Sequence, residues 1–554
     1  ICLVRDSHVE FGTRVQNMET GSFSSHATHV AGTMIAAGVD ADAKGMAYEG
    51  SLKAYDFNNS FNEISSETAG GLRISNHSYG APGGFEFDGA DWYWYGDPSV
   101  SAVEDYTFGY YDFRPRRADE IVYNAPFHVW VMSAGNDGND DFPGQHFVDD
   151  GSGGWTLSSA TRNDDGDYDC ISPTQCAKNV ITVGATQDIP GGWTQPSDVQ
   201  ITGFSSRGPT DDGRIKPDIV ANGSGLYSTE SSGNTAYGFK SGTSMSGPTA
   251  AGSIMLLQEH AVNETGGELL AHTLKGIVLH TADEAGNPGP DYTYGWGLLN
   301  TRKAADHIAD QTGVDTFYQN TLANAGSQTY NLTSNGSQPL RVTICWTDVP
   351  GQAESFPHSL DPTNKKLVND LDLRISGPGS TTFEPYVLNP NNPTANATTG
   401  DNNTDNVEQI YIANPTAGSY TITVDHKGNL TNGSQDFAII ISGGSATVPP
   451  LAAFTANSTS ICTGSTVNFT DQSTNTPTAW SWAFAGGTPA ASSAQNPAVT
   501  YNSPGVYQVE LTVTNAFGTD TETKTGFIKV GNAQTLPYTE DFDAGTPPAD
   551  LTIE

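Results

Sequence analysis

Positive charge is scarce in this chain of 554 residues, which holds 24 Lys and Arg against 62 Asp and Glu. The formal net charge of −38 argues against nucleic acid or an anionic membrane surface as a partner, because both attract clustered Lys and Arg. Long hydrophobic runs are also missing, since no stretch approaches the roughly 18 apolar residues that cross a bilayer. The length and the acidic excess predict an Asp-rich, multi-domain protein, and the lack of long apolar runs predicts that it has no membrane span.

Cysteine is rare as well, with five in the whole chain, which excludes a fold built on a disulfide framework. Cys170 and Cys176 lie six positions apart with Pro173 between them, and a tight loop there can bring two Cα atoms within bridging range. We therefore expect a Cys170–Cys176 disulfide. Both chain ends resemble interrupted strands, so an export signal and a pro-segment are expected outside the given sequence.

The pattern of strands and helices changes along the chain. Residues 1–313 alternate apolar strand-like runs with helical stretches, which predicts an α/β domain with a doubly wound parallel sheet. From about residue 314 the helical patterns end. Residues 314–446 and 451–531 show alternating strands separated by turn residues, which predicts two all-β sandwiches, the first jelly-roll-like and the second Ig-like. Residues 532–554 read as the start of a further module.

The segment 241–248, SGTSMSGP, carries the strongest chemical signal. It precedes an apolar helix, so Ser244 is expected at a helix N-terminus, where free N–H groups and the positive end of the dipole face a bound oxyanion. If the segment stood alone, a serine-rich helix cap would be the better explanation.

Three further residues complete a set for acyl transfer. Asp6 follows a strand at the carboxyl edge of the predicted sheet, where sites gather in parallel sheets. His26 opens a small-residue helix, and Asn136 follows the buried strand-like run 127–133. An Asp, a His and a Ser in this order, with an Asn that can bind an oxyanion, predict nucleophilic catalysis.

These segments resemble the subtilisin-like serine peptidases, or subtilases. The blocks SHATHVAGT, SNHSYG, SAGN, FSSRGP, GTSMSGP and YGWGLLN follow one another in the family's order over some 300 residues. The resemblance implies that Ser244 is the nucleophile, His26 its general base, Asp6 the residue that orients His26, and Asn136 the oxyanion donor. It also implies that substrate is bound along Ser78, Tyr79, Gly80, Ser133, Ala134 and Gly135.

Several positions depart from the family pattern. Arg5, Ser7, His8 and Ala27 stand beside Asp6 and His26 where the family has small or uncharged residues. An aromatic insert after residue 84 is compatible with a rim of the cleft and equally with a loop that packs on itself.

The β regions carry resemblances of their own. Residues 314–446 resemble the P domain of proprotein convertases, which implies a bracing role, and 451–531 resemble a PKD domain, which implies a spacer or a binder of a polymer or surface ligand. Subtilases commonly carry calcium, and hard carboxylate oxygens suit this ion. We therefore expect structural Ca²⁺ and no organic cofactor, with candidate ligands in acidic turns: Asp137, Asp140, Asp141, Asp164, Asp165, Asp167, Asp401 and Asp405.

The sequence thus predicts a secreted or cell-surface serine endopeptidase that acts on proteins or peptides. The alternative is a catalytically inactive relative that only binds through its β domains. The complete set of four site residues favours the enzyme, whereas the unusual neighbours of Asp6 favour the alternative.

Overall fold

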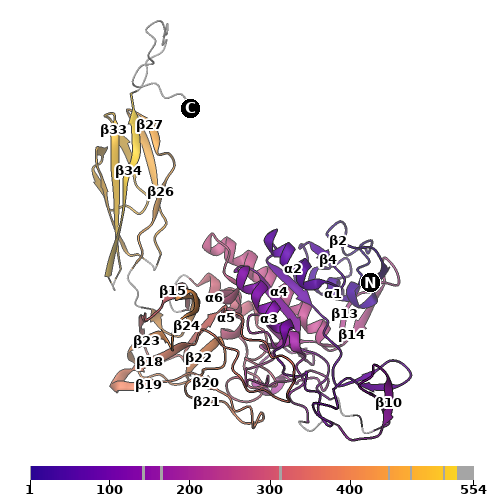
Figure 1. Ribbon diagram of the computed structural model, residues 1–554. Coiled ribbons are helices and arrows are strands. Elements are labelled where there is room, and N and C mark those ends of the chain that lie inside the picture. Colours follow the sequence, from indigo (N-terminus) through magenta and orange to yellow (C-terminus); the bar gives the residue numbers. More distant parts are fainter. Residues whose placement is uncertain are drawn as a thin grey trace. The chain divides into compact units, whose positions relative to one another are not determined.

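The computed structural model describes residues 2–532 except 140–141, 143, 163–165, 311–314, 447–449, 475–476 and 516–517. The chain forms two compact units, the first of residues 1–329 and 334–444, the second of 330–333 and 445–554. Figure 1 labels their helices and strands. None of the described helices is long and apolar enough to cross a membrane.

The first unit is built on a parallel sheet in the order β12-β11-β8-β5, formed by Ile219–Asn222, Ile181–Thr186, Val129–Ser133 and Ile74–His77. Its central strand β8 is buried along its whole length, as expected for a sheet covered on both faces. Successive side chains of a strand point to opposite faces. Val129 and Val131 accordingly join one core cluster, whereas Trp130 and Met132 join another.

Six helices surround this sheet: α1 (Ser25–Ile35), α2 (Ser60–Ala69), α3 (Phe113–Asn124), α4 (Thr243–Thr265), α5 (Ala271–His280) and α6 (Thr301–Ala309). α1, α4 and α5 contribute to the core around Val129, and α2 and α3 to the core around Trp130. Helices therefore cover both faces, which is the doubly wound arrangement that the sequence predicts. α4 contacts all four strands of the sheet, and this fixes its N-terminus.

Short strands complete the α/β domain. β1 (Cys2–Leu3) pairs with β3 (Ser22–Phe23), β2 (Val15–Asn17) with β4 (Leu52–Ala54), and β13 (Leu226–Thr229) with β14 (Tyr237–Lys240). The aromatic insert supplies β6 (Phe85–Phe87) and β7 (Trp92–Trp94), which form a separate sheet with β9 (His146–Asp149) and β10 (Trp155–Ser158) from the segment after β8. A small cluster of Phe85, Trp94 and Val148 forms its core, so the insert packs against the later segment 146–158.

A β-sandwich follows within the same unit. One sheet runs β15-β24-β17-β22, formed by Thr316–Ala323, Ser434–Ser442, Leu340–Trp346 and Val407–Ile412. A second contains β18 (Leu371–Gly377), β19 (Thr381–Phe383) and β23 (Gly418–His426), and β20 (Tyr386–Val387) pairs with β21 (Thr398–Thr399).

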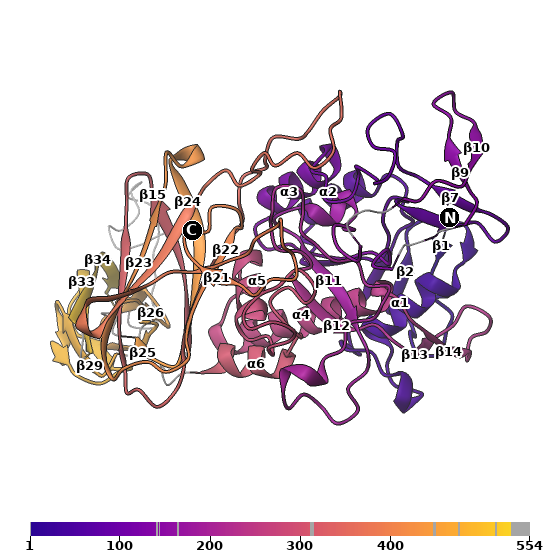
Figure 2. The same ribbon diagram turned by 90° about the horizontal axis from the view of Figure 1, so that it is seen from below.

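The first sheet of the sandwich shares a core with the α/β domain. β17 and β24 contact α5, and a Cβ at Gly276 of α5 would come within 2.7 Å of Ile440 Cδ1 and 3.0 Å of Cys345 Cβ. In Figure 2 strands β22 and β24 lie beside α5. The sandwich therefore braces the helices behind the parallel sheet.

The second unit is an all-β sandwich with sheets in the orders β26-β28-β32-β30 and β27-β34-β33-β29-β31. Its core gathers aromatic side chains, among them Phe454, Phe469, Trp482 and Phe484. The unit also includes two short N-terminal pieces, which are Tyr330–Thr333 of β16 (Gln328–Ser334) and β25 (Ser445–Ala446). The remaining strands are Phe454–Ala456, Ser460–Cys462, Ser465–Asp471, Ala479–Phe484, Gly487–Thr488, Ala491–Ser492, Ala498–Tyr501, Gly505–Asn515 and Gly518–Gly531, numbered β26 to β34.

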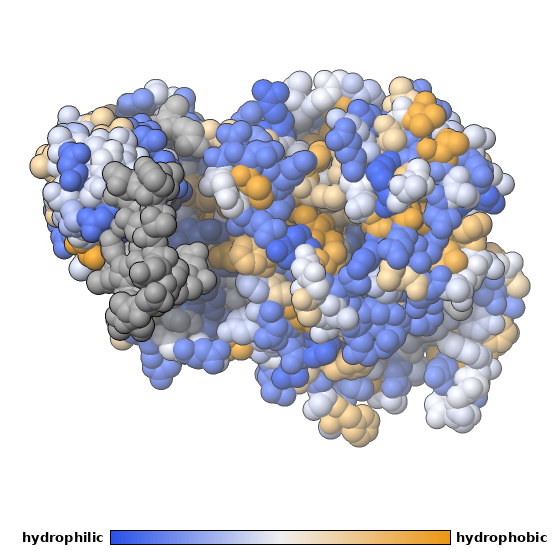
Figure 3. Space-filling model, turned by 90° about the horizontal axis from the view of Figure 1, so that it is seen from above, coloured by the Kyte–Doolittle hydropathy of each residue, from blue (hydrophilic) through white to orange (hydrophobic). Residues whose placement is uncertain are grey.

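The surface agrees with the polar composition. On the face in Figure 3 hydrophilic residues predominate, and hydrophobic residues gather only in small, scattered groups.

Candidate active site

Ser244 is the second residue of α4, the helix that spans the parallel sheet. The first N–H groups of a helix have no partner within it, so the first turn presents donors around this hydroxyl. The side chain is half-buried, and its Oγ donates to the carbonyl oxygen of Ser78 at 3.4 Å, while Ser78 Oγ donates to the Ser244 carbonyl at 3.1 Å. Gly242, at the helix cap, has φ +146°, a conformation that glycine adopts readily.

Asn136 stands beside this helix start. Its Oδ1 accepts hydrogen bonds from the Thr243 N–H at 2.9 Å and from Thr243 Oγ1 at 3.0 Å. Because these two donors occupy the amide oxygen, the donors that remain on the side chain are those of Nδ2, for which the described residues show no acceptor. The side chain is exposed. An exposed amide near a half-buried serine hydroxyl suits the binding of an oxyanion.

The loop after β1 brings Asp6 to the start of α1, which carries His26. The N–H of Ser24, the helix cap, donates to the Leu3 carbonyl at 2.8 Å, and the Arg5 N–H donates to Thr28 Oγ1 at 3.0 Å. Among the described residues no hydrogen bond joins Asp6 to His26 or His26 to Ser244. Catalytic hydrogen bonds are often long in a structure without substrate and shorten when substrate binds.

The surroundings of His26 favour the neutral imidazole. Desolvation by the surrounding protein lowers its pKa, and the positive charge of Lys240 lowers it further. Lys240 ends β14, four positions before Ser244, and pairs with Glu230 at 2.9 Å. Glu230 also accepts a short hydrogen bond from Ser25, the residue before His26. The Lys240–Glu230 ion pair and the His26 imidazole thus belong to one cluster of polar side chains at the start of α1.

The unusual residues beside Asp6 have a structural role. Arg5 donates from Nε to the Ser231 carbonyl at 2.6 Å and from Nη1 to Asn234 Oδ1 at 2.7 Å. Ser7 Oγ donates to the same Asn234 oxygen at 3.0 Å, and His8 Nε2 lies 2.9 Å from the carbonyl oxygen of Ala236. These side chains anchor the Asp6 loop to the turn between β13 and β14. They therefore hold Asp6 in place, and they do not indicate a degraded site.

The six residues expected to bind substrate lie at one edge of the parallel sheet. Ser78–Gly80 follow β5, and Ser133–Gly135 end and follow its neighbour β8. Gly135 has φ +118°, and a Cβ there would come within 2.5 Å of Ser206 Oγ, so this position requires glycine. The structure brings both segments and Ser244 together at the carboxyl ends of the strands.

Comparison with known proteins agrees with this geometry. The family model described as "Subtilase family" matches residues 5–297, which is more than half of the chain. The chain belongs to the subtilase family. A second model, "PKD domain", matches residues 447–530 of the second unit.

Similar proteins include the serine protease AprX of Bacillus subtilis, 30% identical over 166 residues, which cover 28% of this chain and 36% of AprX. Pyrolysin of Pyrococcus furiosus is 32% identical over 209 residues, covering 34% of this chain and 14% of pyrolysin. The subtilisin-like protease SBT3.16 of Arabidopsis thaliana is 31% identical over 173 residues, covering 29% and 22%. The match thus spans about a third or less of these relatives.

Among solved structures, the self-cleaved protease domain of PatA shares 19% sequence identity with a TM-score of 0.38, covering 55% of this chain and 93% of PatA's. The prenylagaramide maturation protease PagA gives the same TM-score and identity, covering 56% and 94%.

The predicted disulfide in this subtilase domain is wrong in the structure, where Cys170 and Cys176 are both free and buried. Pro173–Cys176 forms a single 3₁₀ turn, in which Cys176 Sγ donates back to the Ser172 carbonyl at 3.4 Å. Cys170 Sγ instead accepts from the Arg207 N–H at 3.2 Å. The two sulfurs therefore face different backbone groups, and burial raises the pKa of both thiols.

The four predicted calcium ligands that the structure describes do not form one cluster. Asp137 Oδ2 accepts from Ser206 Oγ at 3.1 Å, Asp167 pairs with Arg207 at 2.6 Å, and Asp405 accepts from the Ile215 N–H at 2.8 Å. Asp401 is paired with two cations, Arg374 at 2.7 Å and Lys427 at 2.6 Å. The other four candidates, Asp140, Asp141, Asp164 and Asp165, lie outside the described residues.

The structure instead gathers Glu104, Asp169 and Asp361, and one carboxylate oxygen of each lies within 4.8 Å of the other two. None of them is among the ligands that the sequence suggests. Asp169 ends the acidic segment 163–169 of the sequence, whereas Glu104 and Asp361 carry no local signal.

Proposed function

We propose that this subtilase is a secreted or cell-surface serine endopeptidase that hydrolyses proteins or peptides through an acyl-enzyme on Ser244. The observation that supports the proposal is the contact of Asn136 Oδ1 with Thr243, the residue before Ser244 at the N-terminus of α4. Hydrogen-bond donors held in place beside a nucleophilic hydroxyl stabilise the oxyanion that forms in acyl transfer, whereas a purely structural site has little need of them.

In the proposed mechanism His26 removes the proton from Ser244 Oγ while this oxygen attacks the scissile carbonyl carbon. The carbonyl oxygen becomes an oxyanion, which Asn136 Nδ2 and the N–H groups of the first turn of α4 stabilise. His26 then gives its proton to the amine leaving group as the C–N bond breaks. A water molecule, deprotonated by the same imidazole, hydrolyses the ester. Asp6 orients His26 and stabilises its protonated form.

The proposed substrate is an extended peptide. Ser78–Gly80 and Ser133–Gly135 offer backbone donors and acceptors on either side of the approach to Ser244, which suits pairing with a peptide backbone. The predicted polymer or surface ligand of the PKD domain stays a prediction.

The oxyanion role of Asn136 is tested by Asn136→Ala. We expect kcat on a peptide substrate to fall by about 10²–10³-fold with little change in KM, because the amide acts on charge that exists only in the transition state. Thr243→Val, which removes only the hydroxyl contact, should cause a smaller loss, and Thr243→Ser should restore activity. Equal kcat values for Asn136→Ala and the wild type would overturn this role.

The proposed base also predicts a pH effect. Neutral His26 is the active form, and the charge of Lys240 opposes its protonation. Lys240→Met should therefore raise the pKa of His26 and move the acidic limb of the kcat/KM profile upward by roughly half a pH unit. Lys240→Arg keeps the charge and should keep the wild-type profile. If the acidic limb of the kcat/KM profile lay at the same pH in Lys240→Met and in the wild type, it would not report the titration of His26.

A purely binding relative is the weaker candidate. Its only support in the sequence is the unusual set of residues near Asp6, and their contacts with the turn at 231–236 explain those residues as anchors.

A further inference from the structure

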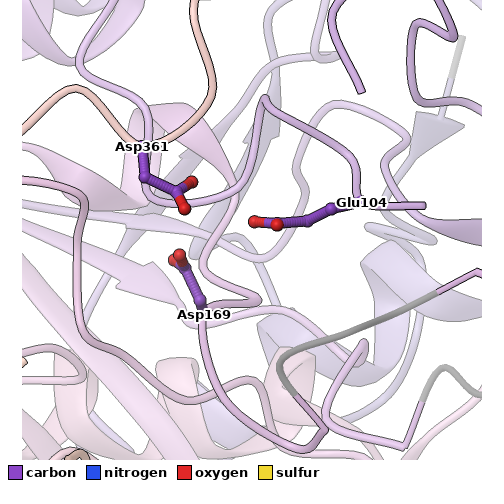
Figure 4. Close-up of side chains that lie close together, drawn as sticks. All are labelled: Glu104, Asp169 and Asp361. Atoms are coloured by element: carbon purple, nitrogen blue, oxygen red, sulfur yellow. The ribbon is translucent and has the colours of Figure 1, made fainter. Parts of the chain in front are cut away.

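Four carboxylates meet between the α/β domain and a loop of the adjoining sandwich, within the first unit. Glu104 and Asp169 belong to the α/β domain, and Asp361 lies in the loop between β17 and β18. Figure 4 shows these three side chains pointing toward one another. One oxygen of each lies within 4.8 Å of the other two, which is about twice the Ca²⁺–oxygen distance of roughly 2.4 Å. Oxygens around one calcium ion have this spacing.

Asp211 is the fourth member and is 8% exposed. A Cβ built on Gly109 would lie 2.0 Å from Asp211 Oδ1 and 2.7 Å from Asp169 Oδ1, so these two oxygens are close neighbours. Both carboxylate oxygens of Asp211 are buried without a hydrogen-bond partner. A buried carboxylate in this state costs free energy unless a cation or a proton neutralises it.

The nearby cations of the protein are already engaged. Arg214 pairs with Asp212 at 2.9 Å, and Arg207 pairs with Asp167 at 2.6 Å. In the described part of the chain no Lys or Arg forms an ion pair with Asp211.

We propose that Glu104, Asp169, Asp211 and Asp361 bind one calcium ion. The donor set consists of hard oxygens only, which Ca²⁺ prefers, and its loops can add carbonyl or water ligands to reach six to eight. Of its four residues only Asp169 belongs to an acidic turn that the sequence suggests, and the site does not depend on the proposed peptidase activity.

The position of the site indicates what the ion does. The loop that carries Asp361 is already docked on the α/β domain: Glu354 N–H donates to the Tyr111 carbonyl at 2.9 Å, and His358 Nδ1 lies 3.1 Å from Tyr110 Oη. A pocket lined in part by Glu104, Asp169 and Asp137 adjoins the cluster, and Asp137 directly follows the oxyanion residue Asn136. The ion thus ties the sandwich loop to the wall of a pocket next to the active site.

The test is calcium binding and thermal unfolding in a Ser244→Ala background, which excludes autolysis. Equilibrium dialysis against Ca²⁺ should show one ion fewer in Asp211→Asn and in Asp361→Asn than in the parent. Asp361 is exposed, so its variant is expected to fold even if Asp211→Asn does not. Asp306→Asn, which removes the same charge from an exposed position of α6, is the matched control and should bind as many ions as the parent.

The unfolding temperatures give a second readout. Saturating Ca²⁺ should raise the midpoint of the parent by about 3–5 °C over its value in EGTA, and a smaller rise is expected for both variants. In EGTA the Asp211→Asn variant should be more stable than the parent, because it removes a buried charge that repels its neighbours. Equal calcium stoichiometry in the parent and in Asp361→Asn would overturn the proposal, as would an equal rise in their midpoints.

Discussion

Ser244→Ala is expected to abolish peptidase activity while the protein stays folded. The expected loss in kcat is about 10⁶-fold, the size known for subtilisin itself, because the nucleophile and its base act as one unit. Ser244 is half-buried at the start of α4, and among the described residues its hydroxyl donates one long hydrogen bond, at 3.4 Å, so its removal disturbs little packing. The measurement is kcat and KM on a peptide substrate, together with the unfolding midpoint.

Ser246→Ala is the matched control for this variant. Ser246 lies two residues further along the same helix, is fully buried, and donates its hydroxyl back to the Thr243 carbonyl at 3.0 Å. We expect its activity to stay within about tenfold of the wild type. If Ser246→Ala were as inactive as Ser244→Ala, the loss would reflect damage to α4, and wild-type activity in Ser244→Ala would refute the assignment.

Lys178→Met is expected to have the largest effect on stability. The Lys178 ammonium is completely buried between the α/β domain and the sandwich, where it pairs with Asp348 and donates to the carbonyls of Val349 at 2.6 Å and Lys366 at 2.7 Å. Its replacement leaves the buried Asp348 carboxylate without a counter-ion, which typically costs 3–5 kcal/mol, roughly the cost of breaking one buried pair. The free energy of unfolding is measured by denaturant titration of inactive protein.

Lys53→Met serves as the control for Lys178→Met. It makes the same substitution in the exposed pair Lys53–Glu67, where Nζ and Oε2 are also close, at 2.7 Å, but 48% of the lysine side chain is exposed. Exposed pairs contribute about 0–1 kcal/mol. Similar losses in both variants would contradict the view that the buried pair joins the two domains.

The sequence predicts those elements of the fold that are continuous and apolar. The expected strand 127–133 and the helix expected from Ser244 correspond to β8 and α4, because both are buried on most sides and so carry long apolar runs. α2 gives no such signal, since Ile64 is its only buried residue and Ser, Asn and Thr fill much of the remainder. Its position is decided by contacts with α3, which the local sequence does not encode.

The residues of the candidate active site also divide into those that the local sequence predicts and those that only the fold brings together. Asp6, His26, Asn136 and Ser244 lie in short motifs, so each can be named from its neighbours in the sequence. The contacts between Arg5 and the residues at 231–234 join positions more than 200 residues apart, and only the folded chain brings them together. The same holds for the carboxylate cluster.

The disulfide prediction failed for a related reason. Spacing alone showed that Cys170 and Cys176 could approach each other, but the direction of each Sγ depends on the 3₁₀ turn at Pro173–Cys176 and on the Arg207 backbone, 37 residues from Cys170.

The central claim, that Ser244 is an activated nucleophile, is tested most directly by labelling the native protein with a fluorophosphonate probe and locating the label by mass spectrometry. We expect one phosphonylated residue, Ser244, and we expect no label in His26→Ala, where the hydroxyl remains but its base is missing. A label on another serine, or equal labelling of Ser244 in the wild type and in His26→Ala, would contradict the account.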